Sequence, residues 1–304
     1  MTGPVRSISV LTPSYQYAQF LTTCLRSVHR QSSPFPVQHI VVDDASTDES
    51  WDIVRREHPD PRDAVRHETN TGLSRTLTEA LRRATGDVVC WLNADDFHLP
   101  WTYAEVARAF TAYPGATLVY GDTAFVDDGS RLTRLVPQPA FDRRVMEGGF
   151  NMFHVPSVFF RREAVPPDFT FDETMKLYMD LDLWLTVTAG SAVIVKTDAV
   201  LSAFRRHAGQ VSAVQRPSDA DEVRTLSRRH TLSPLGAREN GGWTRSSHVR
   251  HALGKVRDGA AVRQLLASRM RGQNLDWTKG ADVPSALQPS SRGARLRSWN
   301  TGQS

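Results

Sequence analysis

Short apolar runs and amphipathic spacings alternate along the first 120 residues of the chain. The apolar runs have the length of buried strands, and they occupy residues 7–12, 37–42, 87–92 and 116–120. Between them, apolar residues recur every three or four positions, which is typical of helices with one buried face. The clearest such segments are 17–28 and 73–84, and a shorter strand is predicted at 64–67. This alternation predicts an α/β fold with a mostly parallel sheet and helices on both faces.

Local signals refine the ends of the predicted helices. Ser46 and Glu49 have the spacing of a capping box, which predicts a helix from there to about Glu57. Gly86 stands where a glycine would terminate the helix at 73–84. Pro100 suits the first turn of the next helix.

Residues 121–215 are patterned less regularly than the first 120. We expect one helix, which carries the apolar face Leu181, Trp184 and Leu185 and ends at Gly190. Strands are predicted at 122–127, 131–136, 157–160, 192–195 and 200–204. This half is therefore expected to be a mixed structure built onto the first sheet.

Polar clusters follow the predicted strands at the points where these strands end. They are Thr12-Pro13-Ser14-Tyr15, Asp43-Asp44 and Asn93-Ala94-Asp95-Asp96. Ligands of open α/β sheets bind outside the carboxyl ends of the strands. The agreement between strand pattern and polar placement therefore predicts a binding site at this edge.

Carboxylates in this position suit a hard divalent cation, and Asp95 and Asp96 are the candidate ligands for Mg²⁺ or Mn²⁺. The alternative is that Asn93 to Asp96 forms only a turn with a side-chain cap. Asp43 and Asp44 could accept hydrogen bonds from a base or a ribose, or could simply complement the dipole of the following helix.

Several nucleotide and hydrolase motifs are absent from the sequence. The first strand is not followed by G-x-G-x-x-G, and the chain contains no G-x-x-x-x-G-K-[ST]. A G-x-S-x-G nucleophile elbow is missing as well. A nucleotide diphosphate bridged by a metal remains the natural ligand.

Composition and charge narrow the class of protein further. The 304 residues are 40% hydrophobic and contain no apolar run long enough to span a membrane. The N-terminus lacks the apolar core of a signal peptide. Cys24 and Cys90 lie in apolar patterns and read as small buried residues in a reducing compartment. We therefore expect a cytoplasmic protein.

The basic residues are concentrated near the C-terminus. From residue 231 onward, 12 Lys and Arg stand against 4 Asp and Glu, a balance of +8, so residues 1–230 carry −4. Nucleic-acid binding is therefore not expected of the main domain. The segment 231–304 is expected to be a basic, loosely ordered extension with one candidate helix near 261–270. It could contact an anionic membrane face near a lipid-linked acceptor, or could be only a solvated tail.

Six motifs occur in an order that resembles a known family over residues 7–215. They are Ser9-Val10-Leu11-Thr12-Pro13-Ser14-Tyr15, Ile40 to Asp48, Asn70-Thr71-Gly72-Leu73, Ala84 to Asp96, His154 to Arg162 with Met179 to Leu185, and Arg205 to Ser212. The chain resembles a family-2 glycosyltransferase with the nucleotide-sugar-binding GT-A fold. The resemblance implies a GT-A domain over 1–230, with a nucleotide-binding half at about 1–120 and an acceptor-side half at about 121–230.

The resemblance also implies an activity and roles for single residues. The activity would be an inverting transfer of a sugar from a nucleotide diphosphate donor, with UDP favoured, to a hydroxyl of a saccharide or lipid-linked acceptor. The nucleotide would be bordered by Thr12, Pro13, Tyr15, Asp44, Asn93 and Asp95. The metal would be held by Asp95, Asp96 and His207, and the general base would be Asp180.

Two residues depart from the pattern that this family often shows. Asn93 replaces a common Asp, and Met179 replaces a common Glu before Asp180. Asp182 is a second candidate base, and Arg205 and Arg206 are candidate phosphate ligands beside His207.

These departures keep an alternative open, a catalytically weakened nucleotide-binding scaffold on the same fold. A sugar-phosphate nucleotidylyltransferase would need a Gly-rich basic loop after the first strand, and Pro13-Ser14-Tyr15-Gln16 is not such a loop.

Overall fold

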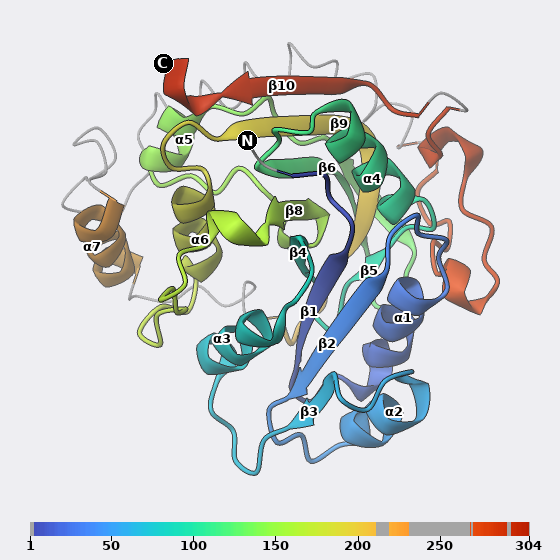
Figure 1. Ribbon diagram of the computed structural model, residues 1–304. Coiled ribbons are helices and arrows are strands. Elements are labelled where there is room, and N and C mark those ends of the chain that lie inside the picture. The colour runs from blue at the N-terminus through green and yellow to red at the C-terminus, as the bar shows by residue number, and fades with distance from the viewer. Residues whose placement is uncertain (1–2, 211–218, 231–267, 269, 291–292, 304) are drawn as a thin grey trace.

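A mixed ten-stranded sheet forms the centre of the computed structural model (Figure 1). The structure describes residues 3–210, 219–230, 268, 270–290 and 293–303. The strands along the sheet follow the order β10-β9-β6-β8-β4-β1-β2-β3, with β5 pairing β9 and β7 pairing β6. Their bounds are β1 (Ile8–Ser14), β2 (Val37–Asp43), β3 (Ala64–Arg66), β4 (Val88–Trp91), β5 (Phe97–His98), β6 (Leu118–Val126), β7 (Leu132–Val136), β8 (Val158–Arg161), β9 (Val193–Arg205) and β10 (Leu296–Asn300).

The direction of the strands changes along the sheet. Strand β1 pairs with β2 and β4 in parallel, and β2 pairs with β3 in parallel. Strand β8 is antiparallel to both β4 and β6, whereas β6 and β9 are parallel. The expected parallel sheet of the first half and the mixed second half are therefore confirmed.

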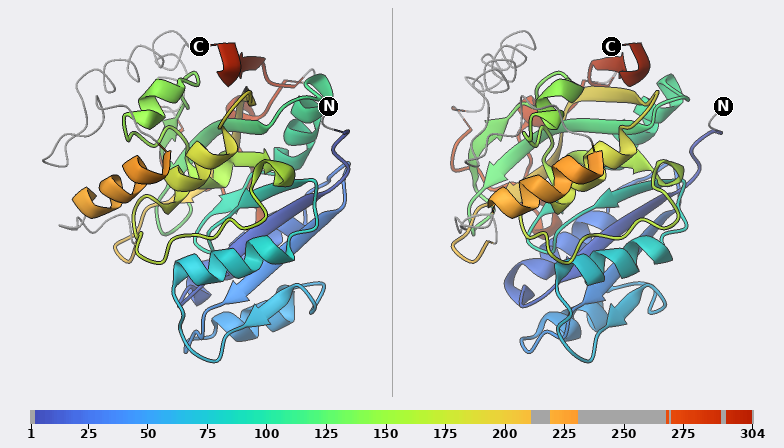
Figure 2. Two further views of the ribbon diagram at one scale, coloured as in Figure 1. Left: turned by 60° about the vertical axis from the view of Figure 1, so that its left-hand side comes forward. Right: turned by 90° about the vertical axis from the view of Figure 1, so that its left-hand side faces the viewer.

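Helices cover both faces of this sheet, as the strand–helix alternation predicts. The helices are α1 (Ala18–His29), α2 (Ser50–Glu57), α3 (Leu73–Arg83), α4 (Thr102–Ala112), α5 (Arg143–Glu147), α6 (Met179–Val187) and α7 (Asp219–His230). Helices α1, α2 and α4 lie on one side of the strands, and α3 and α6 lie on the other (Figure 1). The short α5 and the outer α7, which packs beside α6 (Figure 2), were not predicted.

The two largest apolar clusters of the described residues lie between the sheet and its helices. One joins β1, β2, β4 and β6 to α3 and α6, with Trp184 fully buried at its centre. The other joins the opposite side of the sheet to α1 and α4, and it contains Cys24 and Cys90. Both cysteines are buried and unpaired, as predicted.

Two pairs of predicted strands are continuous in the structure. The strands predicted at 116–120 and 122–127 form β6, and those at 192–195 and 200–204 form β9. The gap between the two strands predicted within β9 contains Lys196, which is fully buried and lies 3.4 Å from Asp122 and 2.8 Å from Asp198. The gap between the two strands predicted within β6 is Gly121 alone. An ion pair inside the sheet therefore hid the continuity of β9, and a single glycine hid that of β6.

The predicted capping box is wrong. Helix α2 begins at Ser50, and its N-cap residue Glu49 makes no side-chain capping bond. Ser46 Oγ instead accepts a hydrogen bond from the Gln16 N–H at 3.0 Å, and Asp48 Oδ1 accepts one from the Ser50 N–H. The loop after β2 is therefore tied to the loop after β1.

Gly86 does not terminate α3, which ends at Arg83. A Cβ atom at Gly86 would lie 2.6 Å from the Ser9 nitrogen and 2.7 Å from the Ile8 carbonyl carbon. The glycine is therefore needed because β1 passes directly against it.

The expected loose order of 231–304 is wrong for the described residues of that segment. Leu275 and Leu287 are buried against β5, β6 and β9, and β10 pairs with β9 in antiparallel fashion. Trp277 Nε1 donates a hydrogen bond to the His98 carbonyl at 2.9 Å. The candidate helix at 261–270 lies mostly outside the described residues, so it stays a prediction together with the boundary near residue 230.

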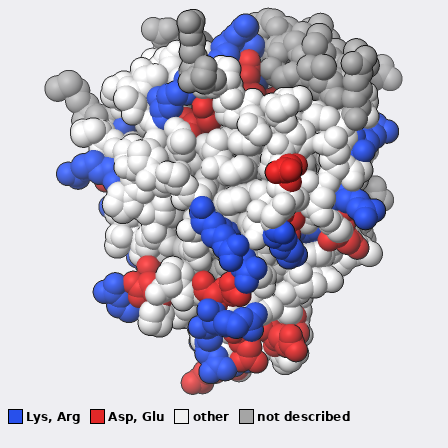
Figure 3. All heavy atoms as spheres, turned by 90° about the vertical axis from the view of Figure 1, so that its right-hand side faces the viewer, with Lys and Arg blue, Asp and Glu red and all other residues white. Residues whose placement is uncertain are grey.

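Surface charge is mixed on the face that Figure 3 shows. Lys and Arg side chains alternate there with Asp and Glu, and a broad area carries neither (Figure 3). In the part of the chain that the structure describes, no helix is both long and apolar enough to cross a membrane.

Candidate active site

A cavity of about 940 Å³ opens at the carboxyl ends of β1, β2 and β4. Segments from the second half of the chain close it, namely the loop before β8, the start of α6 and the residues after β9. A cavity of this size accommodates a nucleotide-sized ligand. The predicted position of the binding site at this edge of the sheet agrees with the cavity.

Most of the predicted nucleotide residues line this cavity. They are Pro13, Tyr15, Asp44, Asn93 and Asp95. Tyr15 is 45% exposed, the one large hydrophobic side chain with such exposure in the described residues. Asn93 Oδ1 accepts a hydrogen bond from Trp91 Nε1 at 2.7 Å, which fixes its side chain beside Asp95.

Thr12 does not reach the cavity, so its predicted place beside the nucleotide is corrected. Thr12 lies within β1, whereas Pro13 and Ser14, the last two residues of the strand, line the cavity. Thr12 is fully buried, and its Oγ1 lies 2.8 Å from His39 Nε2.

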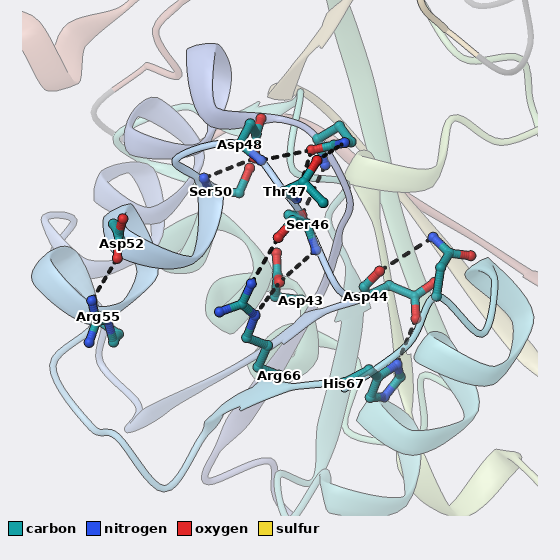
Figure 4. A network of polar contacts seen from close by, with 12 residues as sticks. Asp43, Asp44, Ser46, Thr47, Asp48, Ser50, Asp52, Arg55, Arg66 and His67 are labelled. Carbon is teal, nitrogen blue, oxygen red and sulfur yellow. Dashed lines mark hydrogen bonds and ion pairs between the residues drawn. The ribbon is translucent and has the colours of Figure 1, made fainter.

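Asp44 holds a turn at the rim of the cavity (Figure 4). Its Oδ2 accepts the Gly72 N–H at 2.7 Å, and its Oδ1 accepts the N–H and the hydroxyl of Thr71 and contacts His67 Nδ1 at 2.6 Å. Burial raises the pKa of Asp44, but the hydrogen bonds from Thr71, His67 and Gly72 outweigh burial and lower it. The carboxylate is therefore ionised, and it fixes the 70–72 loop around the cavity.

Asp43 has a structural role in the loop that follows β2. Its Oδ2 accepts the Ser46 N–H at 3.0 Å and lies 3.6 Å from Arg66 Nε (Figure 4). Burial raises the pKa of this carboxyl. Asp43 is not among the residues that line the cavity.

Asp95 and His207 form the polar pair on the floor of the cavity. Asp95 Oδ2 lies 3.1 Å from His207 Nε2, although 112 residues separate them in the chain. The imidazole packs edge-on to Tyr17, with ring centroids 5.9 Å apart. Burial and the negative charges of Asp95 and Asp96 raise the pKa of Tyr17, so its hydroxyl stays protonated. Sequence patterns did not single out Tyr17, because it falls in the apolar pattern of the predicted helix at 17–28, and in the structure it is the N-cap residue of α1.

Asp96 does not line the cavity, so its predicted role as a metal ligand is corrected. It is buried, and its Oδ1 accepts the Arg205 N–H at 2.9 Å. Burial and repulsion from Asp95 raise the pKa of Asp96 well above its usual range. Its carboxyl group is therefore engaged in contacts inside the protein and does not face the cavity.

Arg205 is likewise not a phosphate ligand. Its guanidinium is buried and donates to the carbonyls of Asp95, Asp127 and Asp128 at 2.9–3.0 Å. It also lies over the ring of Phe20, 4.4 Å from the centroid. Arg205 therefore joins the loop after β4 to the loop after β6 and holds Asp95 in place. Arg206 is exposed and lines a smaller, separate hollow that also includes His207.

Asp180, the predicted general base, lines the cavity at the first turn of α6. Its Oδ1 accepts the Leu181 N–H at 2.8 Å, and its Oδ2 accepts a hydrogen bond from Asn151 Nδ2. Burial raises the pKa of Asp180 to about 6. A carboxylate with such a pKa is ionised at neutral pH and is a stronger base than a solvated one.

Asn151 is another site residue that the sequence did not reveal. It lies in an irregular loop without periodicity, 29 residues before Asp180. Lys176 also lines the cavity and was not singled out.

Asp182, the second candidate base, is excluded by its position. It is buried away from the cavity and pairs with Arg229 and with His230, whose Nε2 lies 2.6 Å from its Oδ1. Its carboxylate therefore attaches α7 to α6.

The donor set of Asp95 and His207 fits a divalent ion such as Mn²⁺. One carboxylate and one imidazole are ligands that manganese accepts, and phosphate oxygens and water commonly complete such a shell. The two donor atoms face the cavity from adjacent positions 3.1 Å apart. Asp96 is not needed for this arrangement.

The sequence of this chain is similar to those of known glycosyltransferases. The family described as "Glycosyl transferase family 2" matches residues 9–166, more than half of the chain. The chain is 30% identical over 105 residues to the "Uncharacterized glycosyltransferase alr2836" of Nostoc sp., covering 34% of this chain and 32% of that protein. It is 34% identical over 124 residues to the "O-antigen biosynthesis protein RfbC" of Myxococcus xanthus, covering 40% of this chain and 10% of that protein.

Solved structures agree on the fold. The crystal structure of S. aureus TarS 1-349 in complex with UDP-GlcNAc superposes with a TM-score of 0.61 at 20% identity, covering 84% of this chain and 73% of that chain. The present chain spans only part of the length of its curated relatives. Fold, cavity and family match agree, and the chain belongs to glycosyltransferase family 2.

Proposed function

We propose that the protein is an inverting glycosyltransferase that moves a sugar from a nucleotide diphosphate donor to a hydroxyl group. The observation that supports this most is the shared cavity. It brings the Asp44 loop, the Asp95–His207 pair and Asp180 together, although they come from distant parts of the chain. A transferase needs these three elements: a place for the nucleotide, donors for the diphosphate end and a base.

Asp180 is the base in this proposal. The acceptor hydroxyl gives its proton to Asp180 as its oxygen forms a bond to the anomeric carbon. The bond from that carbon to the diphosphate oxygen breaks in the same displacement, so the configuration inverts. Asn151 orients the carboxylate by its hydrogen bond to Oδ2, and burial maintains its raised pKa of about 6.

In this proposal, Asp95 and His207 face the diphosphate end of the donor and would hold a cation there. Their donor atoms fit a divalent cation, Mn²⁺ or Mg²⁺, which when bound offsets the charge of the departing diphosphate. Arg205 keeps the Asp95 main chain fixed through its bond to the Asp95 carbonyl. Tyr17 packs against the His207 ring and keeps it in place.

We favour a UDP-sugar as the donor and a saccharide or lipid-linked acceptor. The TarS crystal structure, which shares the fold, contains UDP-GlcNAc, and the relative RfbC is named for O-antigen biosynthesis. The exposed Tyr15 beside Pro13 offers a ring face for a base at the rim of the cavity. Cytoplasmic location and membrane contact through the basic C-terminal segment stay predictions.

The test measures donor binding and transfer separately. Thermal unfolding is followed with UDP, GDP, dTDP and CDP, each with and without Mn²⁺, because a ligand that binds the native state raises Tm. Transfer from UDP-sugars is then assayed with the wild type and with Asp180→Asn. We expect metal-dependent stabilisation by UDP in both proteins and transfer only in the wild type.

Two outcomes would contradict this proposal in different ways. Nucleotide binding without any transfer by the wild type, over a broad acceptor panel, would favour the scaffold alternative. An Asp180→Asn protein that retains full transfer would remove Asp180 from the role of base.

A further inference from the structure

Three histidine rings meet outside the cavity, at the junction of α1, β2 and the end of α2. They are His29, the last residue of α1, His39 in the middle of β2, and His58, which follows α2. One ring nitrogen from each lies within 4.8 Å of those of the other two. His39 is buried, and His29 and His58 are partly exposed. None of the three lines the active-site cavity.

The spacing of the rings fits a common ligand. Their centroids are 4.9 Å apart for His29 and His39, 5.2 Å for His29 and His58, and 5.5 Å for His39 and His58. Imidazoles bound to one tetrahedral zinc at Zn–N distances of about 2.0–2.1 Å have ring centres about 5 Å apart. The rings are therefore already close to the positions of three zinc ligands.

Each ring also has an outer hydrogen-bond partner on the nitrogen that a metal would not use. His58 Nε2 lies 2.7 Å from the His39 carbonyl, which can only accept, so this nitrogen carries the proton. The other nitrogen, Nδ1, carries the lone pair, which accepts the Asp60 N–H at 3.2 Å, so a metal ion bound there would displace this long contact. Metal-binding histidines typically donate their second N–H to a carbonyl or carboxylate in this way.

The other two rings show the same arrangement. His39 Nε2 lies 2.8 Å from Thr12 Oγ1, and its Nδ1 lies 2.9 Å from His29 Nε2. The His29 ring also has a main-chain hydrogen bond with Glu57, of the kind that favours a protonated nitrogen. His39 Nδ1 and His29 Nε2 therefore share a single proton, and a cation could replace it.

We infer that His29, His39 and His58 form a binding site for a divalent transition-metal ion of the zinc class. The ligands would be His29 Nε2, His39 Nδ1 and His58 Nδ1, and water would complete the shell on the exposed side. Three imidazoles favour zinc over magnesium, which prefers oxygen ligands. The carboxylate of Glu57, whose main chain contacts the His29 ring, is bound by Arg26 through two contacts of 2.8 Å.

The electrostatic state of the cluster is compatible with metal binding. Burial and the neighbouring His58 lower the pKa of His29 to about 4, and burial with repulsion from His29, His58 and His98 lowers that of His39 further. Both rings are therefore neutral at pH 7, the form that binds metals. Thr12, which the sequence placed at the nucleotide, acts here as the outer partner of His39.

The test uses the untagged full chain after treatment with a chelator. The double variant Asp95→Asn/His207→Asn serves as the background, because it removes the ligands assigned to the donor site. Zn²⁺ binding is measured by calorimetry in this background and after adding His29→Asn or His58→Asn. Circular dichroism checks that each variant is folded. His39 is not substituted, because it is buried and its replacement could unfold the protein.

We expect one Zn²⁺ per chain in the background protein and an affinity loss of about 100-fold or more with either histidine variant. Thr12→Val should cause a smaller loss, about 10–100-fold, as expected for an outer partner. Co²⁺ bound to the unmodified cluster should give the intense visible absorption of a tetrahedral site, and Zn²⁺ should displace it.

The inference is overturned if the background protein binds no Zn²⁺, or if its Zn²⁺ binding survives both His29→Asn and His58→Asn. The Co²⁺ measurement needs no substitution in the cluster. Weak visible absorption, as given by octahedral Co²⁺, would also overturn the inference. These results do not depend on the proposed transferase activity. In the otherwise wild-type chain, His58→Asn should leave the rise in Tm caused by UDP and Mn²⁺ unchanged.

Discussion

Asn151 Nδ2 donates a hydrogen bond to Asp180 Oδ2, joining the loop before β8 to the first turn of α6. This contact favours the ionised form of Asp180, whereas burial raises its pKa to about 6. The transfer needs the ionised base, so kcat/KM should fall about tenfold per pH unit below this pKa.

Asn151→Ala should move the acidic limb of the pH profile to higher pH, because a contact that lowers the pKa of Asp180 is lost. Glu222→Gln is the matched control with the opposite sign, since the Glu222 charge raises this pKa. The acidic limb of the kcat/KM profile should move to higher pH in Asn151→Ala and to lower pH in Glu222→Gln. Identical shifts in both would show that Asn151 acts only on the fold.

Asp95 and Asp96 should respond differently to the same substitution. Asp95→Asn removes the carboxylate that faces the cavity, and the stabilisation by UDP with Mn²⁺ should disappear. Asp96→Asn should retain that stabilisation, because its Oδ1 can still accept the Arg205 N–H. Thermal unfolding with and without UDP and Mn²⁺ measures both. Equal loss in the two variants would restore Asp96 as a ligand.

Gly86→Ala should destabilise the protein by about 1–3 kcal/mol, because the new methyl group would meet the β1 backbone at 2.6 Å. Gly115→Ala is the control, since a Cβ there has no atom within 4 Å. Its effect should stay within about 1 kcal/mol. Urea unfolding of both variants provides the comparison, and a neutral Gly86→Ala would contradict the close approach of β1.

The packing of the C-terminal segment can be tested at Leu275. This side chain is fully buried against β5, β6 and β9, so Leu275→Ala should cost about 2–5 kcal/mol in the free energy of unfolding. Leu296→Ala, at a partly buried position of β10, should cost less than about 2 kcal/mol. Chemical denaturation measures both. A Leu275→Ala protein as stable as the wild type would mean that the segment packs loosely.

Strands β1, β2 and β4 could be predicted because they are buried on both faces and therefore consist of short continuous apolar runs. The same property hid the orientation of single residues. In a run without alternation, nothing in the sequence shows that Pro13 faces the cavity and Thr12 faces the opposite side of β1.

Other errors came from polar groups that tertiary contacts bury. Lys196 interrupted the predicted pattern of β9, because a buried residue of an ion pair, here with Asp122, looks like part of a loop in the sequence. Asp95 and Asp96 are neighbours with the same chemistry, and only their contacts distinguish them. Asn151 comes from a loop, where no periodicity marks a residue.

The late position of β10 in the chain has a consequence for the folding of the protein during synthesis. Strand β9 offers its hydrogen-bonding edge until Leu296–Asn300 have left the ribosome and paired with Val193–Thr197. An open strand edge is a template for pairing with other chains. Chains that end before these residues, whether from truncated mRNA or from proteolysis, should therefore aggregate. Every residue of the active-site cavity would still be present in them.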